Sequence, residues 1–163
     1  DDINSKLTAK VIVNEFNQKE LSEIFCFYGE EKNSRRIGSK IIDYRKKKTI
    51  EDTDELVNII KEGNVYHGKH PATRVFQALR IYVNDELREL DIILKKSLFF
   101  LRKEAKIITV AFHSLEDKII KNFYNNNREL FKILTKKPIT PSNHEIKSNP
   151  RSRSARMRAV ERI

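Results

Sequence analysis

The chain has 163 residues, enough for one domain with its own core, and it carries 33 Lys and Arg against 23 Asp and Glu. The formal net charge of +10 favours a polyanionic partner, either a nucleic acid or an anionic membrane surface. No run of about 18 apolar residues is present, so no membrane span is predicted. A single cysteine, Cys26, excludes an internal disulfide and a cysteine-based zinc site, and it fits a reducing, cytoplasmic compartment.

The start of the chain, DDINSKLTAK, shows no signal peptide. The only methionine is Met157, so we expect a processed or engineered product, or a piece of a longer protein. The first 63 residues carry apolar side chains at helical spacing, with Gly29 as an interruption and Gly63 as a stop. Cys26 lies within an apolar run and is expected to be a small core residue. This part of the chain is therefore predicted to be helical.

Residues 35–48 form a basic segment, with seven Lys and Arg against Asp43. Such a run is usually a solvated helix face. Arginine at this density also suits contact with phosphate groups, because its forked donors match phosphate oxygens. Both interpretations stay open, with the solvated face slightly favoured.

A long helix is predicted over residues 70–101, after a loop at 63–70. Pro71 suits a first helical position, where a backbone N–H has no partner to lose. Apolar residues then follow in steps of three and four, and this stripe must be buried: Phe76, Leu79, Val83, Leu87, Leu90, Leu94, Leu98 and Leu101. The opposite side carries a polar series that a solvated helix does not need, namely Gln77, Arg80, Asn84 and Asp85.

The periodicity changes at residues 106–112, which form a β-branched and nearly continuous apolar run. This pattern predicts a strand that is buried on both faces of a parallel sheet. The strand ends at His113, and a helix follows. Ser114 and Asp117 have the S-x-x-D spacing of a capping box, so Ser114 is predicted to cap that helix.

The remaining sequence predicts a short strand at 131–134 and then a loop, because residues 135–150 hold three of the four prolines. The tail at 151–163 fits either a strand or a helix. This order of elements predicts the second half of an α/β sheet, preceded by a helical insert. We expect a helical insert domain at 1–68 and part of an α/β domain at 69–163.

Candidate sites are few. The glycines form neither a dinucleotide fingerprint nor a P-loop, and His67 and His70 have no further ligand beside them, so no metal site is expected. His113 lies at the carboxyl end of a predicted strand, where open α/β sheets bind ligands. It is equally a pocket residue or a filler of the turn, whereas Ser114 is favoured as a cap over a pocket residue.

A second basic segment occupies residues 147–163. Its cations are Lys147, Arg151, Arg153, Arg156, Arg158 and Arg162. Phosphate contact and a solvated face are equally good interpretations of this segment.

Four stretches are too specific to be generic helices and strands: YGEEKNSRRI (28–37), HPATRVFQALRIYVNDEL (70–87), FHSLEDKIIKNF (112–123) and TKKPITPSNHEIKSNPRSRSARMRAVERI (135–163). In this order they resemble the bacterial family of 16S rRNA cytosine-N4 methyltransferases, and the first is similar to that family's helical insert. The resemblance covers essentially the whole chain but only the C-terminal half of the family. Two local departures are residues 102–105, where the family usually has Pro-Gly-Gly, and a shortened link between Phe123 and Leu134.

The resemblance implies a Rossmann-like methyltransferase sheet that uses S-adenosylmethionine to methylate the N4 amine of a cytosine. The glycine-rich cofactor loop belongs to the family's N-terminal half, so no cofactor-binding residue is expected in this chain. The implied partners are ribosomal RNA, the small ribosomal subunit and a separate N-terminal half. The residues implied for a pocket wall are His113, Ser114, Asn84 and Asp85. The residues implied for RNA contact are Arg74, Gln77, Arg80, Arg151, Arg153 and Arg156.

Two alternatives stand beside an active part of a methyltransferase. One is a non-catalytic RNA-binding module that still binds RNA but no longer transfers a methyl group. The other is a decayed remnant of a split gene. Because half a sheet exposes an edge and an apolar face, the chain alone is also expected to be marginally stable or prone to associate.

Overall fold

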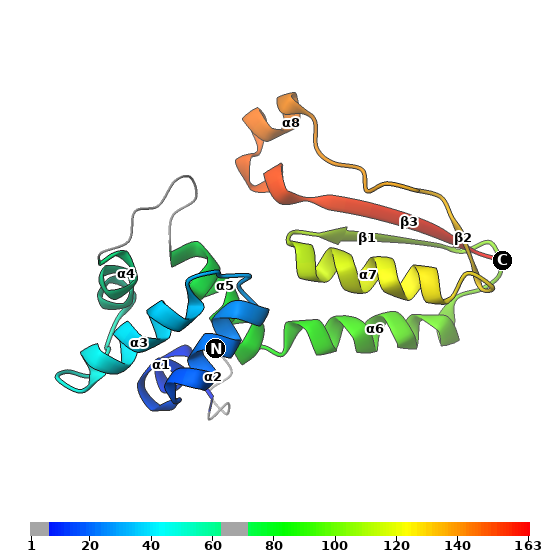
Figure 1. The fold of residues 1–163 in the computed structure, drawn as a ribbon. Helices are drawn as coiled ribbons and strands as arrows, with labels where there is room; N and C mark the ends of the chain where they lie inside the picture. The colour runs from blue at the N-terminus through cyan, green and yellow to red at the C-terminus, as the bar shows by residue number, and fades with distance from the viewer. Residues whose placement is uncertain (1–6, 63–71) are drawn as a thin grey trace. The chain divides into compact units, whose positions relative to one another are not determined.

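The computed structural model describes residues 7–62 and 72–163 (Figure 1). The chain divides into two compact units, which we call unit 1 (residues 1–86) and unit 2 (residues 87–163). The described part of unit 1 is helical and unit 2 combines helices with a three-stranded sheet, so the mixed α/β class is confirmed. The predicted loop at 63–70, the helix start at Pro71 and the domain boundary after residue 68 lie outside the described residues. Within the described ranges, no helix is long and apolar enough to cross a membrane.

Unit 1 places these helices in its described residues: α1 (Ala9–Glu15), α2 (Gln18–Phe27), α3 (Ser34–Arg45), α4 (Thr53–Lys61) and α5 (Ala72–Val83). Three of them begin at a side chain that accepts a hydrogen bond from the helix backbone: Thr8 for α1, Asn17 for α2 and Asp52 for α4. Asn17 and Glu20 also form a complete capping box. The helical prediction for the first 63 residues is confirmed over residues 7–62.

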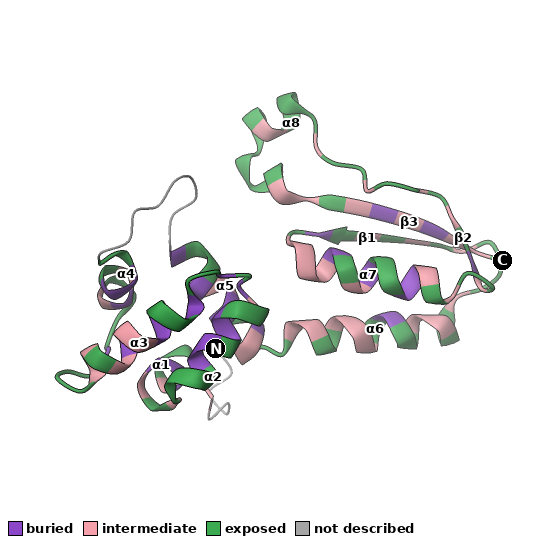
Figure 2. Cartoon of the chain, viewed as in Figure 1, coloured by how far each residue is buried: buried purple, intermediate pink, exposed green. Residues whose placement is uncertain are grey.

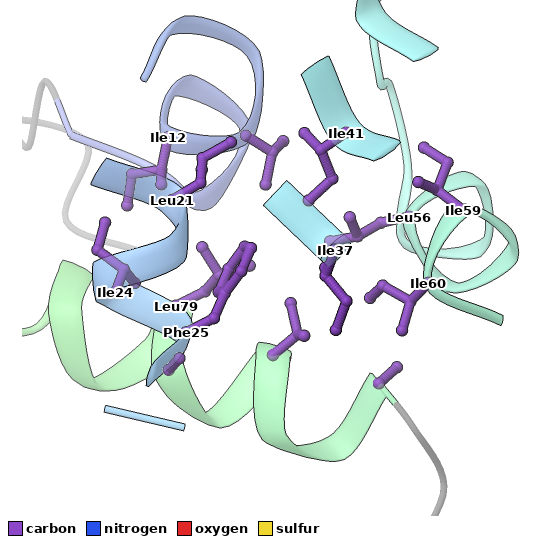
Figure 3. Close-up of a cluster of buried hydrophobic side chains, with 14 of the residues drawn as sticks. Ile12, Leu21, Ile24, Phe25, Ile37, Ile41, Leu56, Ile59, Ile60 and Leu79 are labelled. Carbon is purple, nitrogen blue, oxygen red and sulfur yellow. The ribbon is translucent and has the colours of Figure 1, made fainter. Parts of the chain in front are cut away.

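The core of unit 1 is an apolar cluster between these helices (Figure 3). Figure 2 shows buried residues along α2, α3 and α5. The largest fully buried side chains of this cluster are Phe25, Ile12, Leu21, Ile37, Ile41, Ile60, Leu79 and Val75. Packing is tight at Gly29, where a Cβ atom would lie 2.5 Å from the Arg74 carbonyl oxygen. Only glycine therefore lets the end of α2 approach α5 this closely.

Cys26 is exposed, so its predicted place in the core is wrong. The buried stripe of α2 is formed by Leu21, Ile24 and Phe25. Each further residue turns by about 100° around the helix axis, which carries the next two side chains away from the core. Phe27 accordingly has 67% of its surface exposed. An apolar run of four residues cannot lie entirely on one face of a helix.

The continuous helix predicted over residues 70–101 is also wrong. The structure has two helices, α5 ending at Val83 and α6 at Glu86–Phe100, with Asp85 between them in the left-handed region at φ 49°. Asp and Asn tolerate this conformation better than other non-glycine residues. The apolar stripe is divided accordingly. Leu79 is buried in the unit 1 core, while Leu94 is buried in unit 2.

Unit 2 continues with β1 (Lys106–Ala111), α7 (Ser114–Asn126), β2 (Phe131–Ile133), α8 (Asn143–Ser148), the 3₁₀ helix η1 (Pro150–Ser154) and β3 (Arg156–Arg162). The sheet order is β1-β3-β2, and β3 is antiparallel to both neighbours. The pairs Ile108–Ala159 and Ile133–Val160 fix the register. The ambiguous tail therefore begins in η1 and then forms β3, which is the central strand of this sheet.

Helices α6 and α7 lie on one side of the sheet (Figure 1). The core of unit 2 lies there and contains Leu94, Ala111, Ile120, Phe123, Tyr124, Phe131 and Val160. The ring of Phe131 lies 6.0 Å from each of the rings of Phe123 and Tyr124 between centroids. This distance is typical of stabilising aromatic pairs.

The prediction that β1 is buried on both faces is wrong. Alternate residues differ: Ala111 is buried, whereas 63% of Ile108 and 50% of Val110 are exposed. Phe112, just after the strand, is 55% exposed. The helices cover only one face, and within the described residues β1 pairs only with β3. A run of apolar residues shows that both faces are apolar, but it does not show that this chain covers both.

Candidate functional site

The turn between β1 and α7 is closed by a reciprocal cap. His113 is the N-cap residue, and its Nδ1 accepts a hydrogen bond from the backbone N–H of Glu116 at 3.4 Å. The Glu116 carboxylate accepts in return from the backbone N–H groups of Phe112, at 2.8 Å, and of His113, at 3.3 Å. Ser114 is the first residue of the helix, so the prediction that it caps α7 is wrong. The box is His-x-x-Glu, with an imidazole nitrogen in place of the hydroxyl acceptor.

The His113 side chain is held in place by the same carboxylate. It has 8% of its surface exposed, and its Nε2 lies 3.4 Å from Glu116 Oε1. Of the two interpretations of His113, the structure shows the one in which it fills and caps the turn. Its role as a pocket residue stays a prediction.

Asp117 pairs with the last strand. Its carboxylate accepts hydrogen bonds from Arg158 Nε at 2.6 Å and Nη2 at 3.1 Å, and from Arg156 Nη1 at 3.4 Å. Asp117 and Arg158 are both buried. The Arg158 hydrogen bond outweighs the effect of burial and lowers the pKa of the Asp117 carboxyl below its ordinary value. Arg158 is thereby a structural link between α7 and β3, whereas Arg156 keeps an exposed side chain.

The segment that joins β2 to β3 carries exposed cations. We call residues 134–155 the strap; it includes α8 and η1, and Ile139 attaches it to β3 by a bridge to Met157. The exposed cations of the strap are Lys136, Lys137, Lys147, Arg151 and Arg153. No ion pair joins any of these five to another residue within the described part of the chain. They are therefore available to an external anion.

The 3₁₀ helix η1 presents two of these arginines. Ser152 between them is buried, and its Oγ donates to the Asn149 carbonyl oxygen at 2.8 Å. This anchor leaves Arg151 and Arg153 on the exposed side of the turn. The resemblance implies RNA contact for both arginines but not for Lys136 and Lys137. A Lys-Lys pair directly before Pro138, in a segment predicted to be loop, was the signal that identifies them.

The polar side of α5 is largely engaged within unit 1. Gln77 Nε2 donates to the Tyr28 carbonyl oxygen at 3.2 Å, and Arg80 Nε lies 2.9 Å from Glu86 Oε1. Asn84 Nδ2 donates to the same carboxylate at 3.3 Å. These contacts join α5 to its own neighbours, which gives the polar series a structural explanation.

Of the two arginines predicted to contact RNA on α5, Arg74 has the longer ion pair. Its Nη1 lies 3.8 Å from the buried Glu31 carboxylate, and 47% of its side chain is exposed. Asn84 and Asp85 belong to unit 1, whereas His113 and Ser114 belong to unit 2. The predicted common pocket of these four residues therefore stays a prediction.

Comparison with known proteins gives one family and relatives that share one name. Residues 2–163 match the MraW methylase family. The chain is 50% identical over 168 residues to the Ribosomal RNA small subunit methyltransferase H of Sulfurihydrogenibium sp. (strain YO3AOP1), covering 99% of this chain and 57% of that protein. It is 46% identical to the protein of the same name from Hydrogenobaculum sp. (strain Y04AAS1), covering 98% of this chain and 55% of the relative. The chain thus spans little more than half the length of these curated relatives.

Proposed function

Because the chain belongs to the MraW methylase family, we propose that it is part of an S-adenosylmethionine-dependent methyltransferase that modifies small-subunit ribosomal RNA. The observation that carries this proposal is the family match over residues 2–163, together with relatives named for this activity. The finer proposal follows from the sequence resemblance. The chain is the C-terminal portion, and the whole enzyme methylates the N4 amine of a cytosine in 16S rRNA.

The strap supports an RNA partner. Five exposed cations lie in one segment of unit 2 and form no ion pair with the residues that the structure describes, and the chain as a whole has a net charge of +10. Contacts between Lys or Arg and phosphate oxygens position a protein on RNA without reading its sequence. We assign this role to Arg151 and Arg153, and add Lys136 and Lys137 to them. Arg156 is a weaker candidate, since its guanidinium also contacts Asp117.

The described residues do not fit the cofactor. Gly29 and Gly38 both lie in tight helix contacts of unit 1, where an added Cβ would lie 2.5 Å from the Arg74 oxygen and 2.8 Å from Ser22 Oγ respectively. The turn after β1, where an open α/β sheet binds ligands, is occupied by the His113–Glu116 cap. We therefore assign no cofactor contact and no chemical step to the described residues, and propose from the resemblance that the cofactor site lies in the N-terminal half of the enzyme.

The larger enzyme is proposed to have a Rossmann-like sheet. Within the described residues β1 and β2 run in the same direction, one on each side of antiparallel β3, and a larger mixed sheet can contain this arrangement. The exposed apolar face of β1 also suits burial against further chain. The partner would be an N-terminal half, on the same or a separate polypeptide.

Calorimetry with S-adenosylmethionine tests where the cofactor binds. This chain alone is expected to show no binding at millimolar cofactor, because no cradle for the cofactor is present in its described residues. Tight binding by the chain alone would contradict the proposed division of the enzyme. Methyl transfer to 16S rRNA by this chain together with the missing portion tests the activity itself.

A non-catalytic RNA-binding module is the second candidate. It is favoured by the same strap and by the misfit to the cofactor. Phosphate-dominated binding should weaken steeply as the salt concentration rises. For single-stranded RNA, the logarithm of the binding constant should fall against the logarithm of salt concentration with a slope of about −0.7 per phosphate contact. RNA binding with that slope, combined with failure of methyl transfer even in the presence of the missing portion, would select this candidate.

A further inference from the structure

Unit 1 has a groove of about 570 Å³, and none of its lining residues belongs to the strap or to the β1–α7 turn. It runs along one side of α2 and reaches the start of α3. Its lining residues are Gln18, Lys19, Ser22, Glu23, Cys26, Phe27, Ser34 and Arg35.

Close packing of α2 and α3 shapes this groove. Gly38 of α3 faces Ser22 of α2 so closely that a Cβ at residue 38 would lie 2.8 Å from Ser22 Oγ. Ser22 and Ser34 are buried, which gives the groove a floor of small side chains. Phe27, the last residue of α2, stands beside this floor with 67% of its surface exposed. A large exposed aromatic ring next to a floor of small residues leaves room for a planar group.

The charges around the groove are those that suit a nucleotide. Lys19 and Arg35 line it and are exposed, and neither forms an ion pair with any residue that the structure describes. Glu23 also lines the groove and is exposed, so one carboxylate faces the same space. A carboxylate repels a phosphate but accepts a hydrogen bond from the exocyclic amine of a base. An anionic ligand without an amine would therefore suit the groove less well.

We propose that the groove binds one unpaired nucleotide of RNA, with its base stacked on Phe27 and its phosphates beside Lys19 and Arg35. Stacking on an aromatic side chain and contact with nearby cations is the usual way in which proteins hold single-stranded RNA. Glu23 favours a base with an exocyclic amine over uracil. The inference rests on the proposed function, because it takes RNA as the partner, and it adds a contact surface on unit 1.

Cys26 makes the proposal directly testable, because it lines the groove, is exposed and is the only cysteine of the chain. The probe is a twelve-nucleotide single-stranded oligocytidine, with oligouridine of the same length for comparison. Binding to the chain is followed by fluorescence anisotropy, and occupancy of the groove by the rate at which N-ethylmaleimide alkylates Cys26. At an RNA concentration ten times Kd, the alkylation rate should fall roughly tenfold. Oligouridine should protect less at equal concentration.

Phe27→Ala should lower the RNA affinity by roughly tenfold through the loss of stacking, and so weaken the protection of Cys26. Arg35→Ala should also weaken it, through the loss of a phosphate contact. Lys47→Ala is the matched control, because this substitution removes the same positive charge as Arg35→Ala. Lys47 is exposed on the same basic segment but does not line the groove. All three positions are exposed, and circular dichroism should confirm that each variant keeps its helices.

The outcomes separate this inference from the proposed function. RNA binding by anisotropy without protection of Cys26 would overturn the groove as a nucleotide site and leave RNA binding through the strap intact. Protection that persists in both Phe27→Ala and Arg35→Ala would also overturn it. Absence of any RNA binding would contradict the proposed partner itself.

Discussion

One carboxylate satisfies two backbone N–H groups at the turn after β1, since Glu116 accepts from Phe112 and His113. Glu116→Ala removes both hydrogen bonds, and we expect the free energy of unfolding to fall by about 1–2 kcal/mol. Urea denaturation followed by circular dichroism measures the change. Glu129→Ala is the matched control, because Glu129 is exposed and should alter the free energy by less than about 0.5 kcal/mol. Equal stability of the two variants would show that the cap contributes nothing.

Asp117 makes the free energy of unfolding of unit 2 depend on pH in the acidic range. Hydrogen bonds from Arg158 hold the pKa of its carboxyl below the unfolded value of about 3.9, so the charged form stabilises the fold above that value. This contribution is lost as pH falls through the unfolded value towards the lower folded one. Asp117→Asn should reduce the free energy of unfolding at pH 7 by about 3 kcal/mol, because it leaves the buried Arg158 without its charged partner.

The difference between wild type and Asp117→Asn should therefore narrow below about pH 4. Urea denaturation at pH 7 and at pH 3 measures both differences. Asp43→Asn serves as control, since the pKa of Asp43 is also lowered, chiefly by a hydrogen bond from Lys46, but on an exposed surface. A constant difference between wild type and Asp117→Asn at the two pH values would refute the assignment.

Local sequence predicted where the turn residues lie but not what they contact. The change of periodicity at residue 106 correctly placed His113 at the end of a strand. The common S-x-x-D spacing predicts a capping box at Ser114 and Asp117, whereas the structure has one at His113 and Glu116. The true partner of Asp117, Arg158, lies 41 residues away along the chain. Contacts of that kind depend on which strands become neighbours, which no local pattern specifies.

The break between helices α5 and α6 lies at a residue with a left-handed backbone conformation. Asp85 adopts φ 49°, where an ordinary side chain is strained by about 1–2 kcal/mol. Asp85→Ala should therefore destabilise the chain by about 1 kcal/mol more than Asp85→Gly, because both remove the carboxylate and only alanine keeps a Cβ atom. Thermal and urea unfolding of the two variants measure this difference. An alanine variant as stable as the glycine variant would mean that the break is not held at this residue.

Helix and strand positions were predictable from periodicity, whereas continuity and burial were not. Steps of three and four residues persist across Asp85, so the apolar pattern gives no sign of the left-handed residue at which one helix ends before the next begins. The strand at 106–111 was found at its true position, but its second face is exposed. The tail was recognisable as a strand only once its pairing with β1 and β2 was known.

The exposed sheet face should govern the behaviour of the whole chain in solution. Ile108 and Val110 lie on the uncovered side of β1, at an edge that pairs only with β3 among the described residues. Such a surface promotes association. We expect sedimentation velocity to show association that grows with concentration, and Ile108→Thr with Val110→Thr to reduce it. Ile93→Thr, an exposed change on α6, is the control. A monomer at all concentrations, with a sharp reversible thermal transition, would contradict this expectation.

Methyl transfer by the completed enzyme tests the central claim most directly. The chain is mixed with the portion of the Sulfurihydrogenibium relative that it does not cover, together with S-adenosylmethionine and small ribosomal subunits lacking the modification. Nucleoside mass spectrometry then measures N4-methylcytidine in 16S rRNA. We predict methylated cytidine only when both polypeptides are present, and less of it when Lys136, Lys137, Arg151 and Arg153 are replaced by glutamate. Methylation by either polypeptide alone at the same rate, or none by the two together, would contradict the account.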